Sequence, residues 1–344
     1  MKKAISWIGG PLLAVLLLWL VFRDTSWADL SSQVRRASVP GLVGAGALGV
    51  VHLLLRSFRW RTLLSAARGP ISFRERFSAV SIGYMASLLP GRVGEVLRPL
   101  LLSRRTDVAF GTALATVGVE RIVLDLMAVL LLGGLGLVLP SSWTGLGIGE
   151  ESEALIALRS SGGVVLVALL LALGILVIVA RRRTWVEGVV ERVAGTSANR
   201  VMRAVGRAVS SLLPGLDAFK SPASLVSLLL QTALIWGVIA YSVQLGIESS
   251  GVDLPPAACL LILPLIAAAI ALPTPGGAGT YHGVMLWGLV GLFGADKTAA
   301  ASAAVLTHLV TWIPPLAIGG TFALTGGLAR HDLGIETPPV EAER

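Results

Sequence analysis

The sequence is poor in cysteine and in charge. Its single cysteine, Cys259, excludes an intrachain disulfide and a cysteine-rich metal site. Only 14% of the 344 residues are charged and 54% are hydrophobic, which excludes an ordinary soluble domain and indicates a helical protein that crosses a membrane several times. No spacing of His, Cys, Asp and Glu resembles a zinc motif, and no Ser/His/Asp arrangement indicates a nucleophile. We therefore predict no metal, no cofactor and no enzymatic activity.

The charges that are present are mostly basic, with a formal net charge of +8. They gather in loops between apolar runs, which is typical of cytoplasmic loops and accounts for the charge without a nucleic-acid partner. We predict cytoplasmic loops at 56–76, 104–105 and 181–183, with both termini cytoplasmic. The run Arg56–Arg61, with Phe58 and Trp60, is typical of an interfacial anchor.

Apolar runs at about residues 4–22, 41–55, 110–139, 162–180, 223–246 and 299–324 are predicted to be full spans. The first run also resembles a signal peptide, because Ser26-Trp27-Ala28 weakly matches a cleavage site. We favour an uncleaved span, since the run is longer than a typical signal-peptide core and Arg23-Asp24 precedes that site.

One apolar run is interrupted after thirteen residues, Phe77 to Leu89. A helix of that length is about 20 Å long and falls short of a hydrocarbon core of about 30 Å. Pro90 and Gly91 break the helix, and the segment from Arg92 leads back to the basic residues at 104–105. We predict a re-entrant hairpin here, because both ends point to the cytoplasmic side.

A second interruption follows the apolar run 257–272, and a further apolar segment covers 280–293. The residues of the break are Pro273, Pro275, Gly276, Gly277 and Gly279. Each arm is nearly long enough to span, so this hairpin is either re-entrant or fully crossing. Interrupted segments in corresponding places of two halves are typical of inverted-repeat transporters.

We therefore predict one all-α integral membrane domain, 1–328, with inverted halves at about 1–140 and 160–328. Residues 184–220 have basic and apolar residues at helical spacing, which fits amphipathic helices on the inner leaflet or a solvated loop helix. The tail 329–344 is rich in Pro and Glu and is predicted to be disordered in the cytoplasm.

Six charged residues fall inside the apolar regions. They are Arg92, Glu95 and Arg98, which share a helix face, and Glu120, Arg121 and Asp125, which lie mid-span. One interpretation is a buried ionic staple that joins the first hairpin to the span at 110–139. The other, which we favour, is that the helix start at 91–92 and one or two arginines hold a lipid phosphate.

The second break offers a further helix start at 277–279, aimed from the opposite side. Two positive helix ends at one depth would form an anion cradle, although these glycines also suit close helix packing. His282 and His308 are predicted to be either interhelical hydrogen-bonding groups or, if they share a cavity, proton carriers.

Four motifs together resemble the transmembrane domain of lysylphosphatidylglycerol synthases, a family with many stand-alone bacterial and archaeal members described as flippase-like. They are Arg59-Trp60-Arg61, the run 89–95 with Arg98, Glu120-Arg121 with Asp125, and the run 273–279, in the family's order over about residues 1–328. The resemblance implies a multi-pass protein of the cytoplasmic membrane that moves a lipid between leaflets, or that assists a glycosyltransferase acting on a lipid-linked sugar.

Two features depart from the family. Family members often carry an acid at the position of His282 and a basic residue near His308, so the resemblance does not imply a particular lipid substrate for this chain. The soluble aminoacyl-transferase domain of the full-length synthases is absent, so we do not expect lysyl transfer.

Two hypotheses of different classes follow. The first is a flippase for an anionic lipid, either a phospholipid or a polyprenyl-phosphate-linked intermediate. The second is a non-transporting membrane partner that presents a lipid-linked substrate to a glycosyltransferase or another lipid-modifying enzyme. An intramembrane phosphatase or transferase would be a third, but no recognisable nucleophile accompanies the charged set.

Overall fold

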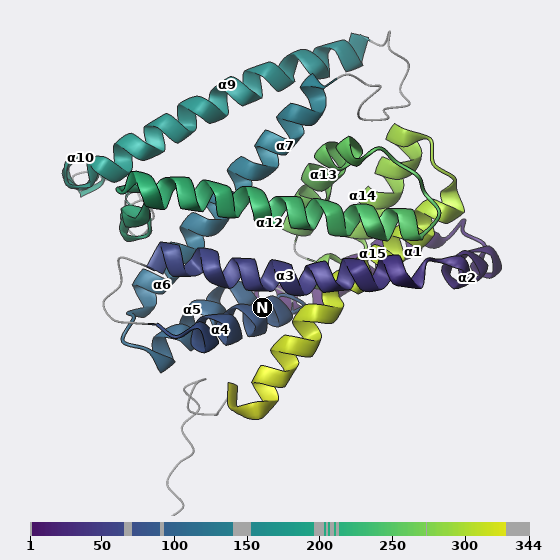
Figure 1. The fold of residues 1–344 in the computed structure, drawn as a ribbon, viewed down its shortest axis with the longest axis horizontal. Coiled ribbons are helices and arrows are strands. Elements are labelled where there is room, and N and C mark those ends of the chain that lie inside the picture. The colour runs from purple at the N-terminus through teal and green to yellow at the C-terminus, as the bar shows by residue number, and fades with distance from the viewer. Residues whose placement is uncertain are drawn as a thin grey trace, which may run out of the picture.

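The chain folds into helices, and the part that the structure describes contains no strand (Figure 1). The structure is a computed structural model. It describes residues 2–64, 71–89, 93–139, 153–195, 213–272 and 274–327, together with positions 203, 206 and 210.

The first half of the described chain contains α1 (Lys2–Phe22), α2 (Trp27–Arg36), α3 (Val39–Leu63), α4 (Phe73–Ala86), α5 (Val93–Arg105), α6 (Phe110–Gly118), the π-helix η2 (Val119–Asp125) and α7 (Leu126–Val138). The second half contains α9 (Glu153–Arg181), α10 (Arg183–Gly195), η3 (Leu213–Phe219), α12 (Pro222–Ser249), η4 (Pro256–Ala258), α13 (Cys259–Ala271), η5 (Pro275–Gly277), α14 (Thr280–Trp287), η6 (Gly288–Leu292), α15 (Lys297–Phe322) and η7 (Ala323–Gly327).

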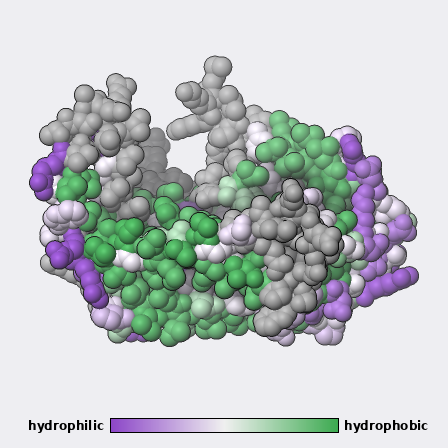
Figure 2. Space-filling view, turned by 90° about the horizontal axis from the view of Figure 1, so that it is seen from above, coloured by the Kyte–Doolittle hydropathy of each residue, from purple (hydrophilic) through white to green (hydrophobic). Residues whose placement is uncertain are grey.

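Five helices in the described chain are long and apolar enough to cross a membrane, and the number rises to six if the bent pair α1–α2 is one span. The five are α3, the continuous run α6–η2–α7, most of α9, α12, and α15 with the start of η7. This confirms the predicted all-α, multi-pass architecture. Figure 2 shows the corresponding surface, with a broad hydrophobic band between hydrophilic residues at the two ends of the long axis.

The long helices α3 and α12 pack side by side along that axis, and α15 packs against α3 and α4 (Figure 1). One buried apolar cluster surrounds Leu53, Trp60, Ile82 and Leu101. A second cluster lies between α12, α13, α14 and α15. Helices α4 and α5 therefore pack into the first cluster, and α13 and α14 pack into the second.

The first interrupted element forms a packed helix pair, α4 and α5. Helix α4 begins with a capping box in which Ser72 and Glu75 bond each other's backbone N–H groups. The pair is close because Gly83 has no side chain, since a methyl group there would lie 2.8 Å from Cβ of Arg98. Each helix is about 20 Å long and shorter than the hydrocarbon core. The predicted break residues Pro90 and Gly91 lie outside the described residues.

The second interrupted element is formed by α13 and α14, which also pack together. The backbone between them turns through Gly276, Gly277 and Gly279, with φ angles of +56°, +76° and +82°. Only glycine adopts such angles without strain, which is why the chain breaks here. The apolar helix that ends at Ala271 begins at Pro256 and is about 24 Å long, short of a full crossing. Pro273 lies outside the described residues.

The predicted amphipathic segment 184–220 divides into two different environments. The described side chains of α10, at 184–192, are exposed or half-buried, whereas Leu213, Leu216 and Phe219 of η3 are buried against α6. A methyl group on Gly215 would lie 2.7 Å from the carbonyl oxygen of Ala115. The end of this segment is therefore part of the core rather than of a surface helix. The predicted disordered tail lies outside the described residues.

Candidate functional site: a buried ionic cluster

A cluster of seven charged side chains lies where α3, α5 and η2 meet. Glu120 is at its centre and is fully buried. Its Oε1 lies 3.0 Å from Arg56 Nη1 and 3.1 Å from Arg59 Nη2, and its Oε2 lies 2.9 Å from Arg98 Nη2. One carboxylate therefore joins guanidinium groups from two helices that are far apart in the sequence.

Asp125 is the second buried acid of the cluster. Its Oδ1 lies 2.8 Å from Arg59 Nη2, and its Oδ2 pairs with Arg56 and with Arg121 Nη1, the latter at 3.1 Å. Arg59 also donates from Nη1 to Thr232 Oγ1 on α12, at 3.0 Å. The cluster thus connects α3, η2 and α12.

The outermost pair of the cluster is Glu95 with Arg121. Arg121 Nε lies 2.9 Å from Glu95 Oε1, and the two side chains are 30% and 28% exposed. The other five side chains are at most 9% exposed. We call the five buried side chains the buried tier. The partly exposed ion pair of Glu95 and Arg121 lies at its edge.

The π-helix explains why two acids five residues apart act together. An α-helix has about 3.6 residues per turn, so positions five apart point about 140° away from each other. A π-turn closes from residue i to i+5, which brings such positions onto one face, and such turns occur often at functional sites. In η2 both Glu120 and Asp125 consequently contact Arg56 and Arg59.

Aromatic rings lie beside three of the guanidinium groups, those of Arg56, Arg98 and Arg121. Arg98 lies over the ring of Trp60 at 4.0 Å, and Trp60 Nε1 donates to Thr116 Oγ1 at 2.9 Å. The ring of Tyr84 lies 5.8 Å from Arg56 and 5.2 Å from Arg121. These distances are those of cation–π contacts, which are stronger away from water.

The cluster contains one more positive than negative charge, since four arginines face three carboxylates. Among the described residues, Nε and Nη1 of Arg98 and Nε of Arg59 have no hydrogen-bond acceptor, although all three atoms are buried. Buried donors without acceptors are costly to keep. The arrangement is therefore chemically suited to accept an anion.

The interpretation of Arg56 and Arg59 as parts of an interfacial anchor is wrong. Both are buried on the face of α3 that also carries Leu53 and Trp60, whereas Arg61 is exposed. The spacing of three and four residues along this face was the available signal. The prediction of a cytoplasmic loop used only the density of basic residues and did not use this spacing. Arg92, which was predicted to belong to the site, lies outside the described residues.

The two predicted histidines lie together, at the second break. Their ring centroids are 4.7 Å apart, and Tyr281 stacks on His308 at 4.5 Å. His308 Nε2 lies 2.9 Å from the carbonyl oxygen of Gly276 and 3.0 Å from Trp312 Nε1. Nε2 can donate to the first or accept from the second, but one tautomer cannot do both.

The two interrupted elements meet at Gly276. A methyl group on Gly276 would lie 2.8 Å from Cδ2 of Leu88, which is two residues beyond the end of α4. Among the described residues, no hydrogen bond, ion pair or ring contact joins the imidazole pair to the ionic cluster. The structure therefore divides the predicted site residues into two groups.

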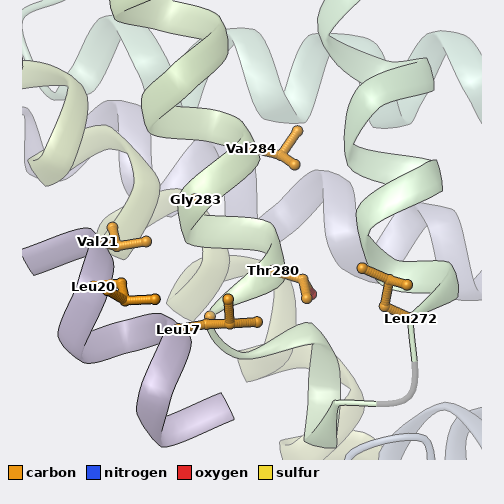
Figure 3. Close-up of a pocket in the computed structure, with 8 residues that line it drawn as sticks. Leu17, Leu20, Val21, Leu272, Thr280, Gly283 and Val284 are labelled. Atoms are coloured by element: carbon orange, nitrogen blue, oxygen red, sulfur yellow. The ribbon is translucent and has the colours of Figure 1, made fainter. Parts of the chain in front are cut away.

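The start of α14 borders an apolar pocket of about 330 Å³ rather than a charged one (Figure 3). Leu17, Leu20 and Val21 of α1 line one side, and Leu272 lines the other. The Thr280 hydroxyl group donates a hydrogen bond to the carbonyl oxygen of Gly277, at 3.0 Å, and is therefore satisfied within the break. The pocket is thus suited to hydrocarbon, which differs from the anion cradle expected at this helix start.

No group of three or more His, Cys, Asp and Glu side chains in the described residues is arranged to hold a metal ion. The acids of the cluster are paired with arginines instead. Its chemistry is therefore that of charge pairing and hydrogen bonding by guanidinium groups.

The fold and this cluster define a multi-pass helical membrane protein with charged residues inside the bundle. Residues 7–319 match the family described as Lysylphosphatidylglycerol synthase TM region, and the chain belongs to that family. A curated relative, Glycosyltransferase AglD of Haloferax volcanii, is 27% identical over 338 residues, covering 90% of this chain and 52% of the relative. The chain spans about half the length of this relative.

Proposed function

We propose that the protein moves an anionic lipid, a phospholipid or a polyprenyl-phosphate-linked intermediate, between the leaflets of a bacterial or archaeal cytoplasmic membrane, with both termini cytoplasmic. The observation that carries the proposal is the buried cluster with one excess positive charge and unpaired guanidinium donors. Charge inside a membrane protein is costly and is typical of substrate pathways. The headgroup phosphate would bind these donors.

The apolar pocket between α1, α13 and α14 supports an amphiphilic substrate, because it offers a place for hydrocarbon close to the second break. Gly279 lines this pocket. It is three residues from Gly276, which lies close to Leu88 near the first break. Movement of the two interrupted elements against each other would expose the cluster to either side. The protein would act without catalysis.

Reconstitution in liposomes tests this proposal. We expect the wild type to move fluorescent phosphatidylglycerol between leaflets, as measured with a membrane-impermeant quencher. Arg98→Gln and Glu95→Gln are expected to abolish the movement. Gly237→Ala is a matched control, because nothing lies within 4 Å of the added methyl group. Undiminished movement in both charge variants would refute the site assignment.

The second candidate is a membrane partner that presents a lipid-linked substrate to a glycosyltransferase. The observation in its favour is the relative named a glycosyltransferase, in which the matching region is about half of the protein. Failure of the purified wild type to move any lipid, together with co-purification of such an enzyme, would support this candidate over the first.

A further inference from the structure

We propose that the ionic cluster selects headgroups with a single negative charge, as in a phosphodiester, over the dianion of a phosphomonoester. This inference rests on the proposed function and specifies its substrate class. The common chemistry is one phosphate group with one ionised oxygen, whether it carries glycerol, another alcohol or a sugar.

The charge count is the first argument. In the buried tier, Arg56, Arg59 and Arg98 face Glu120 and Asp125, which leaves one positive charge. The outer pair of Arg121 and Glu95 is neutral as a unit. A monoanion would neutralise the cluster, whereas a dianion would leave one uncompensated negative charge in an apolar surrounding. Arg92 lies outside the described residues and is not part of this count.

The hydrogen-bond donors are the second argument. Arg98 is 2% exposed, and its Nε and Nη1 have no acceptor in the described part of the chain. The ring of Trp60 lies 4.0 Å from this guanidinium group, and the two unpaired N–H groups point from different edges of its plane. A phosphate oxygen at either edge would satisfy one of these buried donors.

Other groups that face the cluster add no net charge to the count. His52 on α3 accepts a hydrogen bond from Arg56 Nε at 3.0 Å, which requires an unprotonated Nε2. Tyr84 on α4 and Thr232 on α12 are neutral hydroxyl groups. Because His52 is titratable, any test that varies pH needs a ligand whose own charge does not change.

The test compares two lipids with identical acyl chains, phosphatidylmethanol and phosphatidate, binding to the full chain in detergent. Phosphatidylmethanol is a monoanion at every pH used, whereas phosphatidate gains its second charge with a pKa of about 6. At pH 8 we expect phosphatidylmethanol to bind about tenfold more tightly. At pH 5 the two affinities should converge, because phosphatidate is then a monoanion.

A charge variant makes the test sharper. Glu95→Gln adds one positive charge to the cluster without removing a buried partner, because the Glu95 side chain is 28% exposed. In this variant phosphatidate should gain affinity relative to phosphatidylmethanol at pH 8. The Gly237→Ala variant should keep the wild-type preference.

Equal or tighter binding of phosphatidate by the wild type at pH 8 would overturn the inference and leave the proposed function intact. Binding of neither lipid above phosphatidylcholine would overturn both. Competition by dimethyl phosphate, a soluble phosphodiester with one negative charge, at the same concentration as lipid would show a site for soluble phosphates and would also overturn the lipid assignment.

Discussion

At the scale of single residues, the two acids Glu120 and Glu95 have the same charge and different roles. Glu120 is fully buried and pairs with three arginines, whereas Glu95 is partly exposed and pairs with one. Removing one partner from a buried charge network leaves an uncompensated charge, which is strongly destabilising. Exposed pairs contribute little to stability.

We therefore expect Glu120→Gln to lower the free energy of unfolding by about 3 to 5 kcal/mol. Glu95→Gln should change it by about 1 kcal/mol or less. Thermal unfolding of both variants in the same detergent measures the difference. Equal midpoints for the two variants would show that Glu120 does not organise the cluster.

The imidazole pair leads to a second prediction at this scale. His308 Nε2 can bond either Gly276 or Trp312, so a change in its proton state changes which bond is made. We expect lipid movement by the wild type to vary between pH 5 and 8, and the double variant His282→Asn, His308→Gln to lose that variation. A wild-type rate that is constant over this range would exclude proton coupling through these residues.

At the scale of elements, close packing of α4 on α5 positions Arg98 in the cluster. The contact depends on Gly83, where a methyl group would meet both Cβ of Arg98 at 2.8 Å and the Gly94 carbonyl oxygen at 3.1 Å. Overpacking at such a contact typically destabilises by about 1 to 3 kcal/mol. Gly237 on α12 has open space at the same position, so alanine there should be neutral or slightly stabilising.

We accordingly expect Gly83→Ala to lower the unfolding midpoint and to reduce binding of anionic lipid, while Gly237→Ala does neither. Calorimetry and lipid binding on the same preparations would check this. Equal behaviour of the two alanine variants would mean that the α4–α5 contact does not determine the position of Arg98.

Re-entry of both interrupted elements is a prediction that topology can test. In a Cys259→Ala background, Arg74→Cys and Asp107→Cys flank the first element, and Asp253→Cys and Lys297→Cys flank the second. Each pair should react with an impermeant thiol reagent from one side only, the first pair from the cytoplasmic side and the second from the outside. Labelling of one pair from opposite sides would show a full crossing.

The sequence allowed prediction of the elements more fully than of the contacts between them. Span composition and the Pro and Gly residues at the breaks predicted the helices and their interruptions, because hydropathy and backbone freedom are local properties. The roles of Arg56 and Arg59 could not be predicted in this way. Their burial depends on α3 meeting η2, and the π-turn that aligns Glu120 with Asp125 has no clear local signal.

At the scale of the whole molecule, a charged cluster lies inside an apolar bundle. A hydrophobic band covers the middle of the face shown in Figure 2, and the ionic cluster lies between the first interrupted element and the helices around it. Gly276 in the second break lies close to Leu88 near the first break, so movement of one interrupted element would displace the other. This geometry suits a protein that opens alternately to two sides.

The central claim is that the cluster binds an anionic headgroup inside the membrane. Mass spectrometry of the lipids that co-purify with the full chain in mild detergent tests it most directly. We expect wild-type protein to retain anionic lipid in excess over zwitterionic lipid, and Arg98→Gln and Arg121→Gln, if still folded, to lose that excess. Identical lipid composition in the wild type and in either folded variant would contradict the account.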